Sequence, residues 1–185
     1  MALFNGQSTS AYFSTQIGFA RSSISSAQDR YFLDGSIQEI KERILREARI
    51  QLPVLQIDKR KGKRVVIESH GNRHSLGGKQ TMIEVTIPFT GSGDAFILAP
   101  STRTLGVPGE VRDKAIVITL PDDGNLEQEL EAAIGKIQTN LGHFANDYKP
   151  FEAELIAAMN AAASARNEEI ERRKALDAKR SFPIE

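Results

Sequence analysis

A run of five cations within six residues is the densest charge cluster in the chain. Its members are Lys59, Arg60, Lys61, Lys63 and Arg64. Apolar segments at 54–57 and 65–67 flank the run, which predicts a β-hairpin with the cations at its turn. Such a tip would clamp phosphates, and it is a candidate nucleic-acid or nucleotide-binding site. A solvated turn is the alternative, because no aromatic residues are interleaved to stack bases.

Two histidines, together with Ser101 and Arg103, are the other side chains that could take part in a reaction or bind a metal. His70 and His74 have a zinc-ligand spacing, but the glycines around them indicate a loop and no third ligand is close except Glu68. Ser101 and Arg103, taken with the two histidines, give the weakest hypothesis, an enzyme. No set of nucleophile, base and orienting group can be assembled from them. The sequence therefore predicts no catalytic residue, no metal, no cofactor and no enzymatic activity.

The elements that position these residues begin with two expected helices between residues 8 and 52. One apolar face repeats at spacings of four and three, comprising Phe13, Ile17, Ala20, Ile24, Ala27 and Tyr31. Asp34-Gly35 breaks this pattern, and Ser36 with Glu39 predicts a capping box at the start of the second helix. Pro53 is expected to stop that helix.

The middle of the chain, residues 54–121, predicts β-structure. Residues 82–89 alternate apolar and polar side chains, which is typical of a strand with one buried face. Pro88 indicates that this strand ends or lies at a sheet edge there. Residues 115–120 form the last expected strand. We expect an antiparallel sheet of four to five strands.

A long helical segment follows from Asn125. Its apolar stripe comprises Leu126, Leu130, Ile134, Ile137, Leu141, Phe144, Tyr148, Phe151, Leu155, Met159 and Ala162. The spacing is close to that of a coiled-coil seam. Packing inside the chain is one explanation. The other is a partner-binding surface, for an effector or a second copy, at Leu141, Phe144, Tyr148, Phe151 and Leu155. Pro150 is expected to break or kink the helix, or to open a new one.

Length and composition favour one α+β domain over residues 1–165, followed by a charged helical tail or linker at 166–185. The 185 residues hold no cysteine, which excludes disulfides and thiolate metal sites, and the formal net charge is zero. No apolar run approaches the ~18 residues that cross a bilayer. We therefore expect a cytoplasmic protein with no membrane partner.

Two motifs resemble a family of poorly characterised bacterial proteins. The first is Val85-Thr86-Ile87-Pro88-Phe89-Thr90-Gly91, followed by Asp94, Phe96 and Pro100-Ser101-Thr102. The second is Arg172-Arg173-Lys174-Ala175-Leu176 leading to Phe182-Pro183-Ile184, with Arg180-Ser181 in place of the usual Leu-Gly. The resemblance covers roughly residues 79–185.

In that family, a β-containing module with an "IPFTG…PST" signature precedes a long helical segment. In many members an effector domain follows, TIR-like or nuclease-like, in architectures that look like bacterial antiphage defence components. The resemblance thus implies a non-catalytic regulatory or scaffold module that binds an effector protein, a fused effector domain or a trigger. A nucleic-acid or nucleotide-binding regulator that uses the basic run is the alternative.

Overall fold

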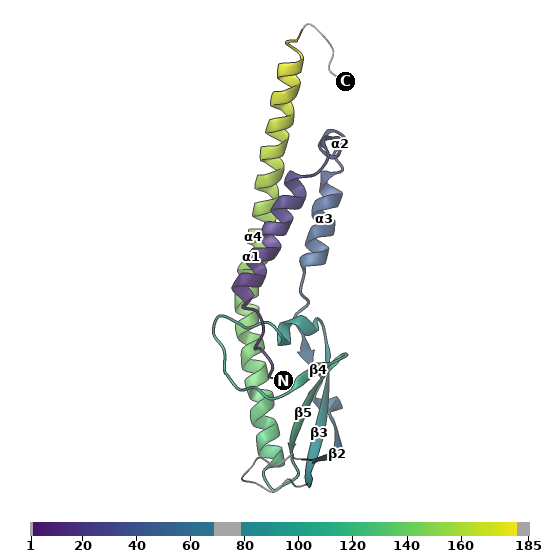
Figure 1. Cartoon of the computed structure of the whole chain (residues 1–185), viewed down its shortest axis with the longest axis vertical. Helices are drawn as coiled ribbons and strands as arrows, with labels where there is room; N and C mark the ends of the chain where they lie inside the picture. The colour runs from purple at the N-terminus through teal and green to yellow at the C-terminus, as the bar shows by residue number, and fades with distance from the viewer. Residues whose placement is uncertain (1, 69–78, 181–185) are drawn as a thin grey trace. The chain divides into compact units, whose positions relative to one another are not determined.

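The computed structural model describes residues 2–68 and 79–180 of an α+β chain, which divides into two compact units (Figure 1). The sheet unit comprises Met1–Thr9 and Ile50–Asp147, and the helical unit comprises Ser10–Arg49 and Tyr148–Glu185. This division differs from the expected single domain at 1–165, because the long C-terminal helix contributes to both units. No boundary falls at residue 165.

Five antiparallel strands form the sheet, as the sequence predicted: β1 (Val54–Leu55), β2 (Lys61–Glu68), β3 (Lys79–Thr90), β4 (Glu110–Arg112) and β5 (Ala115–Pro121). Their order is β1-β3-β5-β4, and β2 also pairs with β3. β1 pairs with β3 at Thr90 and Phe89, while β2 pairs with it from Thr86 back to Lys79. The two strands therefore follow one another along a single side of β3.

The expected hairpin between residues 54–57 and 65–67 is wrong, because β1 and β2 pair with β3 and not with each other. A short 3-10 helix, η1 (Ile57–Lys59), separates them. The expectation for Pro88 is also wrong, because β3 continues to Thr90 and lies inside the sheet. Pro88 is tolerated because its missing N–H falls at the gap between β1 and β2, where its carbonyl accepts from Gln56 N at 2.8 Å.

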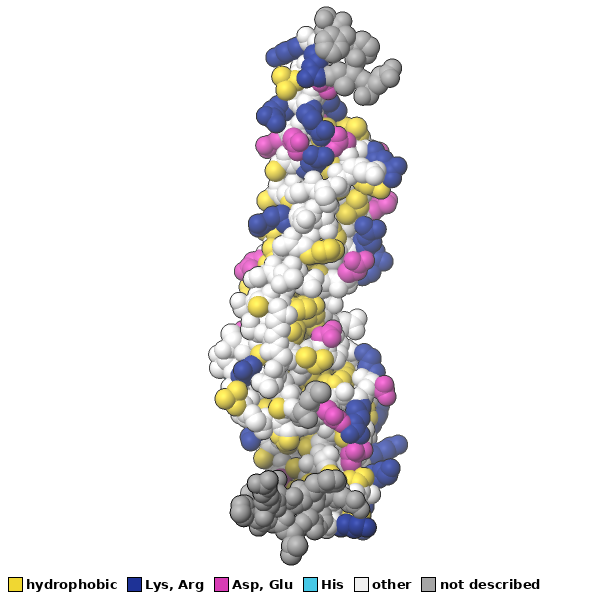
Figure 2. Space-filling view, in the orientation of Figure 1, with side chains coloured by type: hydrophobic (Ala, Val, Ile, Leu, Met, Phe, Trp, Pro, Cys, Tyr) yellow, Lys and Arg dark blue, Asp and Glu magenta, His cyan; other side chains and the backbone are white. Residues whose placement is uncertain are grey.

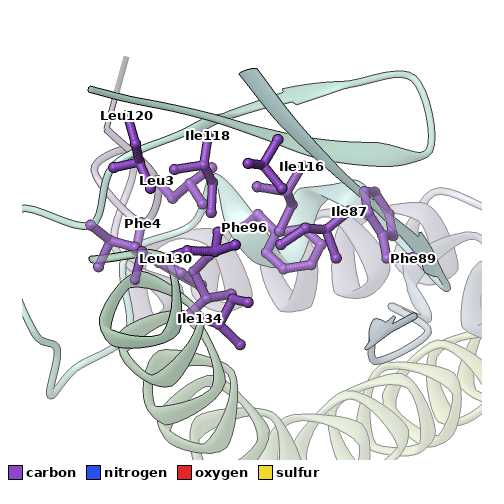
Figure 3. Close-up of a cluster of buried hydrophobic side chains, with 14 residues drawn as sticks. Leu3, Phe4, Ile87, Phe89, Phe96, Ile116, Ile118, Leu120, Leu130 and Ile134 are labelled. Atoms are coloured by element: carbon purple, nitrogen blue, oxygen red, sulfur yellow. The ribbon is translucent and has the colours of Figure 1, made fainter. Parts of the chain in front are cut away.

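One face of the sheet is buried against the first half of α4 (Leu126–Asp177). Figure 3 shows Leu130 and Ile134 of the helix pointing toward Ile116 and Ile118 of β5. The core also includes Leu3, Phe4, Val85, Ile87, Phe89, Phe96, Val107, Leu120, Ala133 and Ile137. The alternation of β3 predicted this face correctly, since Val85, Ile87 and Phe89 are buried while the residues between them are half-buried.

The N-terminal segment belongs to the sheet unit. Leu3 N donates to Val107 O at 3.1 Å, and Ala2 bridges Pro108, which leads into β4. Phe4 is 1% exposed, and its ring contacts Phe96 edge-on at 6.1 Å. Phe4 holds a φ of 57°, a conformation that L-residues adopt at a cost. The buried ring is what stabilises that conformation.

The helical unit consists of α1 (Thr9–Ser25), the short α2 (Asp29–Leu33), α3 (Ile37–Ala48) and the second half of α4. Phe13 of α1 stacks on Phe151 of α4, with ring centroids 4.4 Å apart. At the far end of α4, Arg166 and Arg173 donate to Asp29 at 3.0 and 2.8 Å. Ile170 is 3% exposed and packs within this unit, whereas the described residues that follow it, 171–180, are all exposed.

Three local expectations in the helices need correction. The segment before Pro53 forms three helices, and the last ends at Ala48. The capping box is absent, because the Ser36 hydroxyl donates to Asp34 Oδ1 at 2.6 Å and makes no cap hydrogen bond. Helix α4 has 52 residues and is not broken at Pro150. Gly35, with a φ of 80°, does form the predicted break.

Candidate functional site

The longest open edge of the sheet is β2, and its backbone directions follow from the bonds of β3. Phe89 N donates to Lys114 O, and Asp122 N donates to Thr81 O, which flank the pairs Pro88↔Ala115 and Met82↔Pro121. In an antiparallel ladder, these bonds mark non-hydrogen-bonded pairs. The even-numbered residues of β3 therefore direct their backbone groups away from β5, toward β2.

The register between β2 and β3 then assigns the backbone groups of β2. Lys61, Lys63, Val65 and Ile67 lie opposite even-numbered residues of β3 and exchange hydrogen bonds with them. The backbone N–H and C=O groups of Gly62, Arg64 and Val66 consequently point to the outer side of β2. Within the described parts of the chain these groups have no backbone partner, and all three residues are exposed.

The five cations of the predicted site divide into two groups. Arg60 donates to Glu131 Oε1 at 2.8 Å, and Arg64 donates to Asp122 Oδ2 at 2.7 Å. Both arginines are thus engaged with carboxylates that belong to α4 or to the turn before it. The other three are Lys59, Lys61 and Lys63, which are exposed and make no ion pair with any residue that the structure describes.

Lys61 and Lys63 lie on the sheet face opposite the core, because they pair with Thr86 and Glu84. On that face Glu84 accepts from Arg112 Nη1 at 3.1 Å, and Arg112 also pairs with Glu110. Since β5 lies between β3 and β4, this ion pair crosses over β5. Both of these acids are thus engaged with Arg112, and among the described residues neither forms an ion pair with Lys61 or Lys63, although Glu84 lies opposite Lys63 in the ladder.

Figure 2 shows dark blue Lys and Arg side chains along the lower right side of the molecule, where Figure 1 places β2. Two apolar residues on the same strand are also exposed, Val66 at 60% and Ile67 at 46%. The candidate site, which we call the β2 edge, therefore consists of the outward backbone of Gly62, Arg64 and Val66 with the side chains of Lys59, Lys61, Lys63, Val65 and Ile67. Its chemistry is that of an unpaired strand with excess positive charge.

The hydroxyl cluster has a structural role. Ser101 donates to Asp147 twice, from Oγ to Oδ1 at 2.6 Å and from N to Oδ2 at 2.8 Å. Thr9 Oγ1 donates to Asp147 Oδ2 at 2.7 Å, and Arg103 donates to the Phe4 carbonyl at 3.1 Å. His70 and His74 lie outside the described residues.

Burial raises the pKa of Asp147, but the hydrogen bonds from Ser101 and Thr9, with His143 nearby, outweigh this effect and lower the pKa below its ordinary value. A carboxylate with a lowered pKa that already accepts three hydrogen bonds is a poor general base. Sequence reasoning missed Asp147 and Asn140, which is fully buried and bonds both backbone groups of Thr104. A polar pair seven residues apart beside the apolar stripe is the signal that would have found them.

The partner-binding residues proposed on the long helix are largely covered by the chain itself. Phe144, Phe151 and Leu155 are 0, 2 and 1% exposed, while Leu141 and Tyr148 are half-buried. The Tyr148 ring lies 5.7 Å from Phe151 and 6.0 Å from Phe13. This burial corresponds to the alternative explanation, packing inside the chain.

The helical unit has an open groove of about 590 Å³ between α1 and α3. It is lined by Phe19, Ser23, Ser26, Ala27, Gln28, Tyr31, Ser36, Glu39, Ile40, Arg43, Ile44, Arg46 and Glu47. Because both acidic and basic side chains line this groove, its charge does not favour a ligand of either sign. Within residues 2–68 and 79–180, no three metal-ligating side chains are grouped to hold an ion, and no helix is long and apolar enough to cross a membrane.

Comparisons with known proteins give no relative for this chain. No family model matches it, and no curated protein or solved structure matches it either.

Proposed function

We propose that this chain is a non-catalytic interaction module of a bacterial defence-type system, which binds an effector protein through the β2 edge. The single observation that supports this proposal best is the open edge itself, with three outward-facing backbone positions and three lysines lacking partners among the described residues. An exposed strand of this kind is a template for pairing with another chain.

Three motif residues of the resemblance support a scaffold role, because they help to hold the fold together. Phe89 packs in the core, and Ser101 binds Asp147. Gly91 has a φ of 87°, and a Cβ atom there would lie 2.7 Å from Leu52 O. Only glycine fits that position. A signature made of packing, turn and hydrogen-bonding residues is what a positioning module requires.

A nucleic-acid or nucleotide-binding regulator is the second candidate, because unpaired lysines also attract phosphate. Two observations weigh against it. Arg60 and Arg64, the residues best suited to bidentate phosphate contacts, are already bound to carboxylates. A nucleic acid would also leave the outward N–H and C=O groups of β2 without strand partners.

The test is a pull-down from the native host, with captured proteins identified by mass spectrometry. Val66→Pro removes one outward N–H and leaves the pairs with β3 intact, whereas Val66→Ala keeps that N–H. We expect an effector-domain protein to co-purify with the Val66→Ala chain and to be lost with Val66→Pro. Equal capture by both variants would contradict the proposal.

A further inference from the structure

We infer that the occupant of the β2 edge is an extended acidic segment of the partner protein, which adds to the sheet as an antiparallel strand. This inference rests on the proposed function and specifies its ligand. It follows from which groups of β2 point outward, which face each side chain occupies and which charges lack a partner.

The backbone sets the register. A partner strand would exchange hydrogen bonds with Gly62, Arg64 and Val66, whose N–H and C=O groups face it. Lys61, Lys63 and Val65 would then lie in the non-hydrogen-bonded pairs of the new ladder. In such pairs the Cα atoms are about 4.5 Å apart, and side chains on one face approach most closely.

The side chains set the sequence of the partner. Lys61 and Lys63 share the face opposite the core, so two acids at alternate positions would each lie opposite one lysine. Val65 and Ile67 continue on the same face, and apolar residues would pack against them. In the antiparallel direction, the partner reads apolar-x-apolar-x-acid-x-acid over seven residues. Lys59, just before β2, adds further positive charge.

The other face of β2 contributes little to selectivity. Arg64 donates from Nε to Asp122, so part of its hydrogen-bonding capacity is already used within the chain. A Cβ atom at Gly62 would contact only Ile83, at 3.5 Å, so the space beside this glycine is open to any partner side chain. The partner position opposite Gly62 is therefore unconstrained, while the exposed Val66 on this face would accept an apolar side chain opposite it.

Two other occupants fit less well. A second copy of β2 would bring the same cations to an edge where three lysines already make no ion pair with the described residues. A nucleic acid would compensate the lysines, but it has no amide groups to complete the ladder of Gly62, Arg64 and Val66. An acidic peptide strand satisfies both the charge and the backbone.

The experiment uses fluorescence anisotropy with the full chain and labelled peptides. The probe is Val-Thr-Val-Thr-Glu-Thr-Glu. One control, Val-Thr-Val-Thr-Thr-Glu-Glu, moves one acid to the other face, and a second replaces both glutamates with lysine. We expect the probe to bind about two- to fivefold more tightly than the first control, because one cross-strand ion pair is lost, and at least about tenfold more tightly than the second, because both pairs become repulsive.

Variants of the chain complete the test. The double variant Lys61→Glu with Lys63→Glu should reverse the preference, so that the lysine peptide binds more tightly than the probe. Val66→Pro should weaken the probe at least about fivefold relative to Val66→Ala, because one ladder hydrogen bond is missing. Equal binding of the three peptides, or no binding of the probe, would overturn the inference.

The remaining outcomes separate the two proposals. Loss of the host effector with Val66→Pro, without any binding of the probe, would leave the proposed function standing and remove the acidic ligand. Probe binding that Val66→Pro does not change would remove strand addition and the proposed function together. Tight binding of a single-stranded oligonucleotide, lost on lysine reversal and unchanged by Val66→Pro, would assign the lysines to nucleic acid. A dimer by light scattering that Val66→Pro dissociates would assign the edge to a second copy.

Discussion

The two edges of the sheet differ in what the chain itself places beside them. The edge strand β4 has three residues, Arg112 on it is held in ion pairs, and the N-terminal segment pairs with the residues that lead into it. The edge strand β2 has eight residues, and no described segment pairs with its outer side.

Natural sheets protect long edges, and lysine on an edge strand is one such protection against aggregation. Lys61 and Lys63 therefore oppose pairing of β2 with strands in general, and the same two charges favour the acidic strand proposed above. The difference between the edges teaches that exposure of β2 is not a general property of this sheet. On the β4 side, the N-terminal segment pairs with the residues that lead into the edge strand, and Phe4 in that segment adopts an unusual backbone conformation.

The largest effect on stability is expected from a substitution in the N-terminal segment, which pairs with the residues that lead into β4. Phe4→Ala removes a ring that is 1% exposed and should lower the free energy of unfolding by about 3 to 5 kcal/mol. Urea denaturation measures this change. The control Phe19→Ala removes a ring that is 59% exposed and should change stability by no more than about 0.5 kcal/mol. Similar effects of the two changes would show that the N-terminal segment does not close this side.

Asp147 is expected to give the next largest effect. Asp147→Asn weakens three hydrogen bonds to a carboxylate and should cost about 1 to 3 kcal/mol at neutral pH. Because the folded pKa is lowered, this contribution is present above the unfolded pKa of about 3.9 and is lost as the pH falls through the folded pKa. The stability gap between wild type and variant should therefore shrink below about pH 4.

Urea denaturation over a pH series measures this gap, with exposed Asp58→Asn as the control. A gap that stays constant down to the lowest pH at which the chain folds would contradict the role of the Asp147 charge.

Two neighbouring proline substitutions sharpen the assignment of β2. Val65→Pro removes an N–H that bonds to β3, while Val66→Pro removes one that points outward. Val65→Pro should lower the free energy of unfolding by about 1 kcal/mol or more beyond the effect of Val66→Pro, because only the first breaks a ladder hydrogen bond. Thermal unfolding followed by circular dichroism compares them. The reverse order would mean that the inner and outer positions have been exchanged.

The smallest effect is expected for the lysines. The double variant Lys61→Gln with Lys63→Gln should remain within about 0.5 kcal/mol of the wild type, because neither lysine makes an ion pair with the described residues and glutamine introduces no like charge opposite Glu84. Urea denaturation provides this measurement, with Arg60→Glu as a comparison that also loses the contact with Glu131. A larger loss from the lysine variant than from Arg60→Glu would indicate that the lysines stabilise the fold.

Much of this architecture could be predicted from periodicity. The stripe of α4 is buried or half-buried over its whole length from Leu126 to Ala162, and the alternation of β3 identified the buried face. Both patterns reflect burial, which the sequence records residue by residue. The hairpin failed for a different reason. The local sequence does not determine which strand a given strand will pair with. Because one side of β3 is long enough for both β1 and β2, each of them pairs with β3 and not with the other.

The candidate site was predicted in part. The basic run marks the right segment, but the sequence does not distinguish the two arginines that reach carboxylates from the lysines that do not, since Glu131 and Asp122 are distant along the chain. The outward direction of Gly62, Arg64 and Val66 depends on the register with β3, which only the folded sheet defines. Similarly, the Ser36 side chain had two local partners, the Asp34 carboxylate as an acceptor and the N–H groups of the first turn of α3 as donors, and only the bond to Asp34 forms.

Amide hydrogen exchange along β2, measured by NMR with and without the acidic peptide, tests the central claim most directly. We predict that Lys63, Val65 and Ile67 are protected in the free chain while Arg64 and Val66 exchange rapidly, and that the peptide protects Arg64 and Val66. Protection of Arg64 and Val66 in the free monomer, or rapid exchange that bound peptide leaves unchanged, would contradict the assignment of β2 as an open, strand-accepting edge.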